Sequence, residues 1–424
     1  MKNRIAILCL VIPCFLSAEK LRVDVSAPSA ILINAETGAV LFEKGAHQPS
    51  YPASITKIAT ALYALEKKGE QLHAQAVASH DCVATVAPAI RQSPHYNHPP
   101  YRLEVGGSHI GIQVGEVLSL KTLLYGLLLS SGNDAANVIA EHVSGSVAQF
   151  VQELDEFLQS RGVNETRFLN PHGLHHPHHV TTAYDMAKIT QLAFKHPQFR
   201  EIVKTIRHER PKTNKQNASY LLQSNRLLKL GAYYYPKAIG VKTGYTSKAG
   251  HTLVAAASHE GRSLIAVLLG CESMEARYKD AIRLFDAAFN EKPVYRTLFS
   301  KEFDHFFRRI RGGKSSIEGA LVKDLEFAFY LSEEPKIKSE LKWLPVKLPV
   351  AEGDRVGSLI IKDERDNILR EEPLFAVHSV NKTVFRASVD MCRDHRNGII
   401  FGMLALNLLG LMIYFYKKTH KVIE

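Results

Sequence analysis

Three short motifs constrain the fold of this chain more than any other feature of its sequence. They are Ser54-Ile55-Thr56-Lys57, Ser131-Gly132-Asn133 and Lys242-Thr243-Gly244. Each is short enough to occur by chance in a chain of this size, so none is strong evidence alone. Their common order is informative, because together they carry the groups that one serine-based site requires. If they serve one site, the fold must bring together segments almost 200 positions apart.

The first motif is predicted to begin a helix. Apolar residues recur after it at helical spacing, and a glycine follows as a C-cap: Ile55, Ile58, Ala59, Leu62, Leu65 and Gly69. Residues three apart share a helix face, so Ser54 and Lys57 can lie within hydrogen-bond distance. Lys57 can accept the serine proton if burial and a second cation such as Lys242 lower its pKa. The alternative is a serine N-cap beside a solvated lysine.

The second motif lies in a break between two apolar helical stretches, residues 119–129 and 134–143. This pattern predicts a rigid turn between buried helices. On such a turn Ser131 can relay a proton between Lys57 and a leaving nitrogen, and Asn133 can hydrogen-bond a substrate amide. The alternative is an ordinary polar turn.

The third motif is predicted to lie on a strand beside a β-hairpin, whose apolar runs 251–258 and 263–270 are joined by the turn 259–262. Lys242 and Thr243 would offer a cation and a hydroxyl to a substrate carboxylate, while Gly244 would let a substrate backbone approach. The amides of Ser54 and Tyr245 could form an oxyanion hole. The alternative is an exposed strand end with a solvated lysine.

With these motifs the chain resembles the low-molecular-weight penicillin-binding proteins, the D-alanyl-D-alanine carboxypeptidase family related to class A β-lactamases. Further matches are Tyr51-Pro52-Ala53-Ser54, Leu129-Ser130-Ser131-Gly132-Asn133-Asp134-Ala135, Asn170-Pro171-His172-Gly173-Leu174, and Lys242-Thr243-Gly244-Tyr245-Thr246 followed by Ala249-Gly250. The resemblance covers residues 25–290. It implies an α/β (α+β) catalytic domain of the serine β-lactamase and DD-peptidase type, with an antiparallel sheet flanked by helices.

The resemblance implies a penicillin-sensitive serine carboxypeptidase that removes the terminal D-alanine from peptidoglycan stem pentapeptides through an acyl-enzyme on Ser54. The expected catalytic residues are Ser54, Lys57 and Ser131, and the expected substrate-binding residues are Asn133, Lys242, Thr243, Gly244, Tyr245 and Arg277. Arg277 is carried over from the family as a residue beside the substrate's terminal carboxylate. β-Lactams are expected to bind as inhibitors, and no cofactor or metal ion is expected.

Two other functions are compatible with the motifs. One is a catalytically degenerate, membrane-tethered protein that binds the cell wall. The other is a serine β-lactamase, which in class A requires a glutamate in the pattern E-x-x-L-N. Here Leu169-Asn170 is present, but Thr166 occupies the glutamate position and Glu165 lies one residue too early. The sequence therefore predicts slow release of penicillin from Ser54.

Both ends of the chain are hydrophobic. Residues 1–18 are predicted to be a signal peptide, and a lipoprotein signal ending at Cys14 is the weaker alternative. Residues 398–416 are predicted to form a transmembrane helix, followed by a cytoplasmic tail at 417–424. These segments predict a single-pass protein of the bacterial inner membrane with its catalytic domain on the periplasmic face.

Between the catalytic domain and this helix, residues 292–385 show short alternating apolar runs and are predicted to form a small all-β domain. The stretch 349–357 resembles the C-terminal β-domain of the same family, where that domain is a stalk. Nothing in it indicates catalysis.

The remaining features are less informative. The net charge of +11 suggests nucleic acid, but no recognition motif is present, and the basic patch at 308–314 is interpreted as a solvated face. Cys82, Cys271 and Cys392 allow at most one disulfide in the mature chain. The histidine-rich segment 172–179 lacks the spacing of a metal site, so its histidines other than His172 are predicted to lie on the surface. Residues 84–101 form either a loop at the cleft or a surface insertion.

Overall fold

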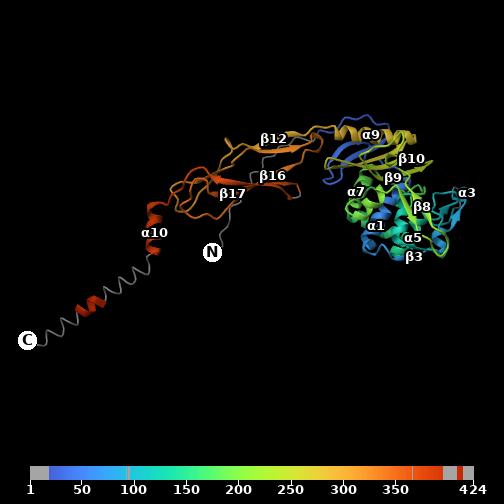
Figure 1. Cartoon of the computed structure of the whole chain (residues 1–424), viewed down its shortest axis with the longest axis horizontal. Coiled ribbons are helices and arrows are strands. Elements are labelled where there is room, and N and C mark those ends of the chain that lie inside the picture. The colour runs from blue at the N-terminus through green and yellow to red at the C-terminus, as the bar shows by residue number, and fades with distance from the viewer. Residues whose placement is uncertain (1–18, 92, 94–95, 365, 395–407, 414–424) are drawn as a thin grey trace, which may run out of the picture. The chain divides into compact units, whose positions relative to one another are not determined.

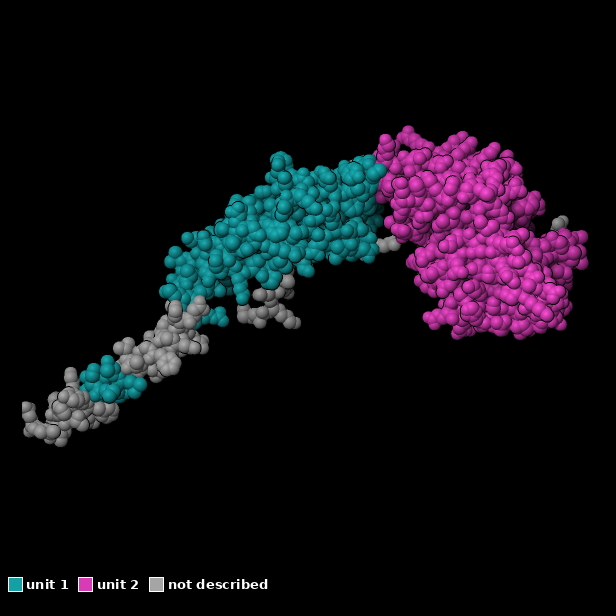
Figure 2. Space-filling model, in the orientation of Figure 1, with its two compact units in different colours: residues 1–17, 293–329, 335–424 teal, residues 18–292, 330–334 magenta. Residues whose placement is uncertain are grey.

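The structure, a computed structural model, describes residues 19–91, 93, 96–364, 366–394 and 408–413. The predicted signal peptide and most of the predicted membrane helix lie outside these residues. The chain divides into two compact units (Figure 2), of which the first comprises residues 18–292 and 330–334. The second comprises residues 293–329 and the chain from 335 onward. Across the described ranges, we find no helix with the length and apolarity needed to span a bilayer.

The first unit is built on a five-stranded antiparallel sheet with the strand order β2-β1-β11-β10-β9. Its strands are β1 Ser29–Asn34, β2 Val40–Lys44, β9 Ala238–Thr246, β10 Gly250–His259 and β11 Arg262–Cys271. The predicted hairpin is confirmed, with Glu260 and Gly261 in the left-handed conformation that a two-residue turn requires. Strand β9 lies at the edge of the sheet.

Both faces of this sheet are covered by helices, as Figure 1 shows. Alternate residues of β1 enter two different cores: Ile31 and Ile33 point into one, while Ala30 and Leu32 point into the other. The larger core contains the helices α1 Lys57–Lys68, α4 Leu120–Leu128, α5 Asn133–Ser144, α6 Val147–Ser160, α7 Ala183–Ala193 and α8 Pro197–Lys204. The smaller core lies under α9 Met274–Phe289. The predicted antiparallel sheet flanked by helices is therefore confirmed.

Shorter elements complete the first unit. They are η1 Ala53–Thr56, η2 Gly69–Gln71, β3 Gln75–Val77, α2 His80–Val83, β4 Thr85–Val86, α3 Pro88–Arg91, β5 Leu103–Glu104, β6 Val117–Ser119, β7 Arg207–Arg210, β8 Ser219–Leu222 and η3 Arg226–Leu228. Strands β7 and β8 pair as a hairpin, and β3 pairs with β6. Cys82 and Cys271 are both buried and unpaired.

The second unit is β-rich, as its alternating pattern predicted. A five-stranded sheet of order β13-β14-β18-β17-β16 and the pair β12-β15 enclose a separate apolar core. The elements are β12 Val294–Phe299, β13 Phe306–Arg308, β14 Ile317–Ala320, β15 Leu325–Phe329, β16 Ile337–Trp343, β17 Arg355–Asp363, β18 Ile368–Ala376 and the helix α10 Val384–Asp394.

The segment 330–334, which contains η4 Leu331–Glu333, groups with the first unit although its flanking strands belong to the second. The reason is a buried cation. Arg262 donates to the Glu333 carboxylate at 2.8 Å and forms an ion pair with Glu291 at 3.0 Å, and its guanidinium lies 3.8 Å from the Tyr330 ring centroid. Ser332 completes the contact by donating to Glu291.

Candidate active site

Ser54 lies in the short 3-10 helix η1, and the α-helix itself starts at Lys57, so the predicted helix begins with a tighter turn. The three-residue spacing still brings the two side chains together, because Lys57 Nζ donates to Ser54 Oγ at 3.0 Å. Lys57 is completely buried. The serine hydroxyl thus faces an amine from which water is excluded.

Two further acceptors hold the Lys57 amine. Its Nζ donates to Asn133 Oδ1 and to the backbone oxygen of His172, both at 2.7 Å. Burial, followed by the nearby charge of Lys242, places the pKa of Lys57 well below its ordinary value, although Asp134 opposes the shift. A neutral amine has two hydrogens and one lone pair. In the neutral form of Lys57, the two hydrogens can bond Asn133 Oδ1 and the His172 backbone oxygen. The lone pair is then directed at the Ser54 hydroxyl.

The second motif forms the predicted turn between α4 and α5. Its middle residue, Gly132, is the N-cap of α5, and Ser131 adopts the left-handed backbone conformation at φ 60°. Asn133 contacts Lys57 through Oδ1, which leaves its side-chain nitrogen as a donor for a substrate. Among the described residues, Ser131 is not a hydrogen-bond partner of Lys57.

The third motif lies on the edge strand β9, where Lys242 is completely buried. Burial, together with the charge of Arg277, lowers the pKa of Lys242 to about 7. The Thr243 hydroxyl lies 3.1 Å from the Ser224 hydroxyl. A Cβ atom at Gly244 would lie 2.9 Å from the Ser54 amide nitrogen, so β9 passes directly beside the nucleophile. Only glycine permits this approach.

The two remaining residues predicted at the site flank the third motif. Tyr245 is 60% exposed, and its ring centroid lies 4.5 Å from that of His251. Arg277 is buried behind the strand, where Nη1 donates to the backbone oxygens of Gly244 at 3.0 Å and Thr252 at 3.2 Å. Arg277 therefore contacts the backbone of the third motif, and its charge acts on Lys242.

The segment 170–174 contacts Lys57 directly, which its sequence alone did not indicate. The backbone oxygen of His172 is one of the acceptors of Lys57, and its ring donates from Nε2 to Tyr101 O at 3.1 Å. Burial, followed by the charge of Lys57, holds the pKa of His172 well below its usual range, so the ring stays neutral. The family-like motif at this segment could have indicated these positions, but it says nothing of their contacts.

One prediction about the histidine-rich segment is wrong. The sequence predicts a surface position for His179, but the side chain is 2% exposed. It accepts from Leu169 N at Nδ1, so Nε2 can donate to Thr56 Oγ1 at 2.9 Å, and Thr56 in turn donates to Ala53 O. Burial lowers the pKa of His179 to about 3. The side chain therefore supports the turn that carries Ser54, a role that composition cannot reveal.

Gly173 is the most constrained glycine near the nucleophile. It has φ +91°, and a Cβ atom there would lie only 1.9 Å from Ala53 O. We expect Gly173→Ala to displace the Ser54 turn and to lower the rate of acylation by a fluorescent penicillin at least 100-fold. The matched control is Gly145→Ala, which has φ +83° but open space around it. This control carries a similar backbone strain, about 1–2 kcal/mol; equal acylation rates of the two variants would contradict the expectation.

A serine nucleophile that lies beside a buried lysine and next to the edge strand of a helix-flanked antiparallel sheet defines a serine peptidase of the penicillin-binding class. The three motifs meet, since Lys57 bonds Asn133 and Gly244 lies against Ser54. The chain belongs to peptidase family S11, the D-alanyl-D-alanine carboxypeptidases, whose profile matches residues 16–273. The family and enzyme class predicted from the motifs are thereby confirmed.

Individual relatives agree with this assignment. The D-alanyl-D-alanine carboxypeptidase DacF of Bacillus subtilis is 30% identical over 364 residues, which is 85% of this chain and 87% of that protein. The crystal structure of the Streptomyces K15 DD-transpeptidase is 28% identical and covers 63% of this chain and 98% of its own, with a TM-score of 0.54. The structure of DacD from Francisella tularensis covers 87% of this chain and 96% of its own at a TM-score of 0.57; at 22% identity it shows the fold alone.

Proposed function

We propose that this protein removes the terminal D-alanine from peptidoglycan stem pentapeptides through an acyl-enzyme on Ser54. The observation that carries the proposal is the buried Lys57 amine, 3.0 Å from Ser54 Oγ and lowered in pKa. A lower pKa means that the amine loses its proton more readily, and the neutral amine can accept the serine proton as the hydroxyl attacks. Family membership supplies the substrate class.

The proposed acylation step assigns one role to each of the remaining groups. Ser54 Oγ attacks the carbonyl between the two D-alanines, and its proton passes to Lys57. The amides of Ser54 and Tyr245 stabilise the oxyanion, while Lys242 and Thr243 hold the free carboxylate. Ser131 passes the proton to the leaving nitrogen, so D-alanine departs as a neutral amine. Arg277 supports the carboxylate site from behind β9.

The function is tested with purified protein and a peptide ending in D-Ala-D-Ala. Release of D-alanine, with no release of alanine from the matched peptide ending in D-Ala-L-Ala, supports the proposal. Mass spectrometry of the β-lactam adduct should locate the label on the peptide that contains Ser54. A degenerate wall-binding protein would bind the peptide without releasing D-alanine, and that result would overturn the proposal.

Deacylation of a bound penicillin should be slow, because Thr166 occupies the position of the class A glutamate base. Glu165 pairs instead with His47 at 2.7 Å, and Thr166 bonds the carboxylate of Asp185 at 2.8 Å. We expect the penicilloyl-enzyme to persist for minutes or longer when free penicillin is removed and the labelled protein is followed over time. Rapid turnover of penicillin by the purified protein would instead indicate a β-lactamase.

We also propose that residues 398–416 anchor the chain in the bacterial inner membrane, with the catalytic unit on the periplasmic side and 417–424 in the cytoplasm. The support is the length and apolarity of this segment together with the hydrophobic residues 1–18. A chain ending at Asp394 should move from the membrane fraction to the soluble periplasmic fraction. Retention of the truncated chain in the membrane would contradict the anchor.

A further inference from the structure

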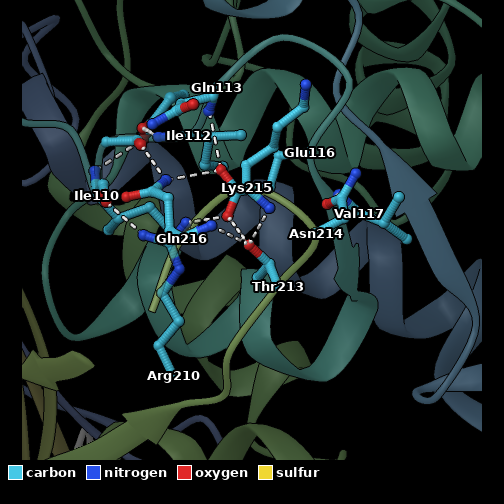
Figure 3. A network of polar contacts seen from close by, with 12 residues as sticks. Ile110, Ile112, Gln113, Glu116, Val117, Arg210, Thr213, Asn214, Lys215 and Gln216 are labelled. Atoms are coloured by element: carbon cyan, nitrogen blue, oxygen red, sulfur yellow. Dashed lines mark hydrogen bonds and ion pairs between the residues drawn. The ribbon is translucent and has the colours of Figure 1, made fainter. Parts of the chain in front are cut away.

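A polar cluster outside the catalytic residues joins two loops of the first unit (Figure 3). At its centre is Glu116, which is completely buried. Its carboxylate forms an ion pair with Arg210 and accepts from Thr213 Oγ1 and Gln216 Nε2, both at 2.7 Å, and from Gln113 N at 2.9 Å. Burial alone would raise the pKa of Glu116, but these hydrogen bonds together hold it below its usual value. The carboxylate is therefore ionised and fully satisfied.

The side-chain donors come from the β7–β8 hairpin, whereas Glu116 and the Gln113 amide lie in the loop before β6. Three further hydrogen bonds join the same segments. Asn214 donates to Gly115 O at 2.8 Å and accepts from Val117 N at 2.9 Å, and Gln216 also donates to Gly111 O at 2.7 Å. We call these contacts between residues 210–216 and 110–117 the hairpin clasp.

The clasp connects to the second motif through Ile110. Arg210 Nη1 donates to Ile110 O at 2.7 Å. The amides of Ile110 and Ile112 in turn donate to the two carboxylate oxygens of Asp134, each at 3.0 Å. Asp134 directly follows Asn133, whose amide donates to Ser108 O at 2.8 Å and whose side chain holds Lys57. The Arg210 guanidinium is thus linked to the Lys57 amine through hydrogen bonds and the short stretches of backbone between them.

The second motif needs such support. Ser131 has φ 60°, a conformation that non-glycine residues keep only when their surroundings hold them in it. The base of the same hairpin touches this turn, since Leu222 N donates to Ser130 Oγ at 3.2 Å. The hairpin is therefore fastened to the turn at its base and to the neighbouring loop at its tip.

We propose that Glu116 and Arg210 are positioning residues for acylation. The clasp fixes loop 108–112 on Asp134, which holds the turn 131–133 where Asn133 can orient the Lys57 amine and Ser131 can reach the leaving group. In the described part of the chain, the carboxylate site on β9 receives no hydrogen bond from the clasp. Loss of the clasp therefore slows the acylation step and leaves the initial binding of the β-lactam unchanged. This inference rests on the proposed function.

The test measures acylation of the full chain by a fluorescent penicillin under stopped flow, which separates the limiting rate k2 from the dissociation constant K. Glu116→Gln removes the charge but keeps the shape, and Arg210→Lys keeps the charge but loses the forked geometry that serves both Ile110 and Glu116. We expect each variant to lower k2 at least tenfold and to change K less than twofold. Asn214→Ala, at an exposed position, should lower k2 a few-fold.

The matched control is Glu291→Gln, which breaks the buried ion pair with Arg262 away from the three motifs. It should lower the melting temperature as Glu116→Gln does, with k2 unchanged. The proposal is overturned if the clasp variants lower only the melting temperature, or if K rises while k2 is constant. If Glu116→Gln fails to fold, Asn214→Ala is the deciding variant. An unchanged k2 in Asn214→Ala would then overturn the proposal. Failure of the proposed function is distinct, because the wild-type protein would then not release D-alanine.

Discussion

Ser54→Ala is expected to abolish both the release of D-alanine and covalent labelling by a fluorescent penicillin. The substitution removes the only hydroxyl that Lys57 Nζ contacts among the described residues, and no other group beside this amine can then form the ester. The carboxylate site on β9 should stay intact, so a peptide ending in D-Ala-D-Ala should still bind without being cut. Both activities are measured on the same preparation, by amino-acid analysis and by gel fluorescence.

The control for this variant is Ser160→Ala at the end of α6, which should leave both activities unchanged. Ser54 contributes a single side-chain hydrogen bond to the described structure, worth about 1 kcal/mol. The melting temperature of Ser54→Ala should therefore change little. Residual labelling of the variant would mean that the nucleophile is a different residue.

Lys57→Arg is expected to lower acylation by three orders of magnitude or more. A guanidinium remains protonated at every accessible pH, so it cannot accept the serine proton even where it keeps the positive charge. In the wild-type protein, acylation should rise with pH as Lys57 loses its proton, and the low pKa of this buried amine places that rise well below the ordinary range of lysine. The arginine variant should lack this pH-dependent rise.

Lys67→Arg is the matched control, because Lys67 lies on the exposed part of the same helix. It should show the wild-type rate and pH profile. If Lys57→Arg kept the rising limb of the pH profile, the proton acceptor would be another group, and Ser131 would be the first candidate. Thermal unfolding of both variants separates a catalytic loss from a packing defect at the buried position.

Local patterns predict the elements that carry the motifs. The apolar periodicity after Ser54 corresponds to α1, and the paired apolar runs correspond to the hairpin of β10 and β11. These predictions succeed because helical and strand periodicity are properties of neighbouring residues. The same patterns do not predict the 3-10 turn at η1, since it depends on Gly173 and His179 packing against it from more than 100 positions away.

Contacts between distant segments are beyond local patterns. His179 is buried by contacts with distant residues, and Glu116 pairs with Arg210 on a distant segment. Nothing in a single sequence indicates that these segments contact each other. The grouping of residues 330–334 with the first unit depends in the same way on Arg262. From sequence alone, a charged residue in a loop is predicted to be exposed to solvent. Only the structure shows which residues bury it and pair with it.

The sequence by itself determined the chemical groups of the site, their order along the chain and the family to which the protein belongs, because three motifs in fixed order carry that information. The tertiary structure alone decided that Lys57 is buried among Ser54, Asn133 and the His172 carbonyl. The physical reason is that a lysine becomes a base only through desolvation and neighbouring charges. Those conditions are set by segments that meet in space and not along the chain.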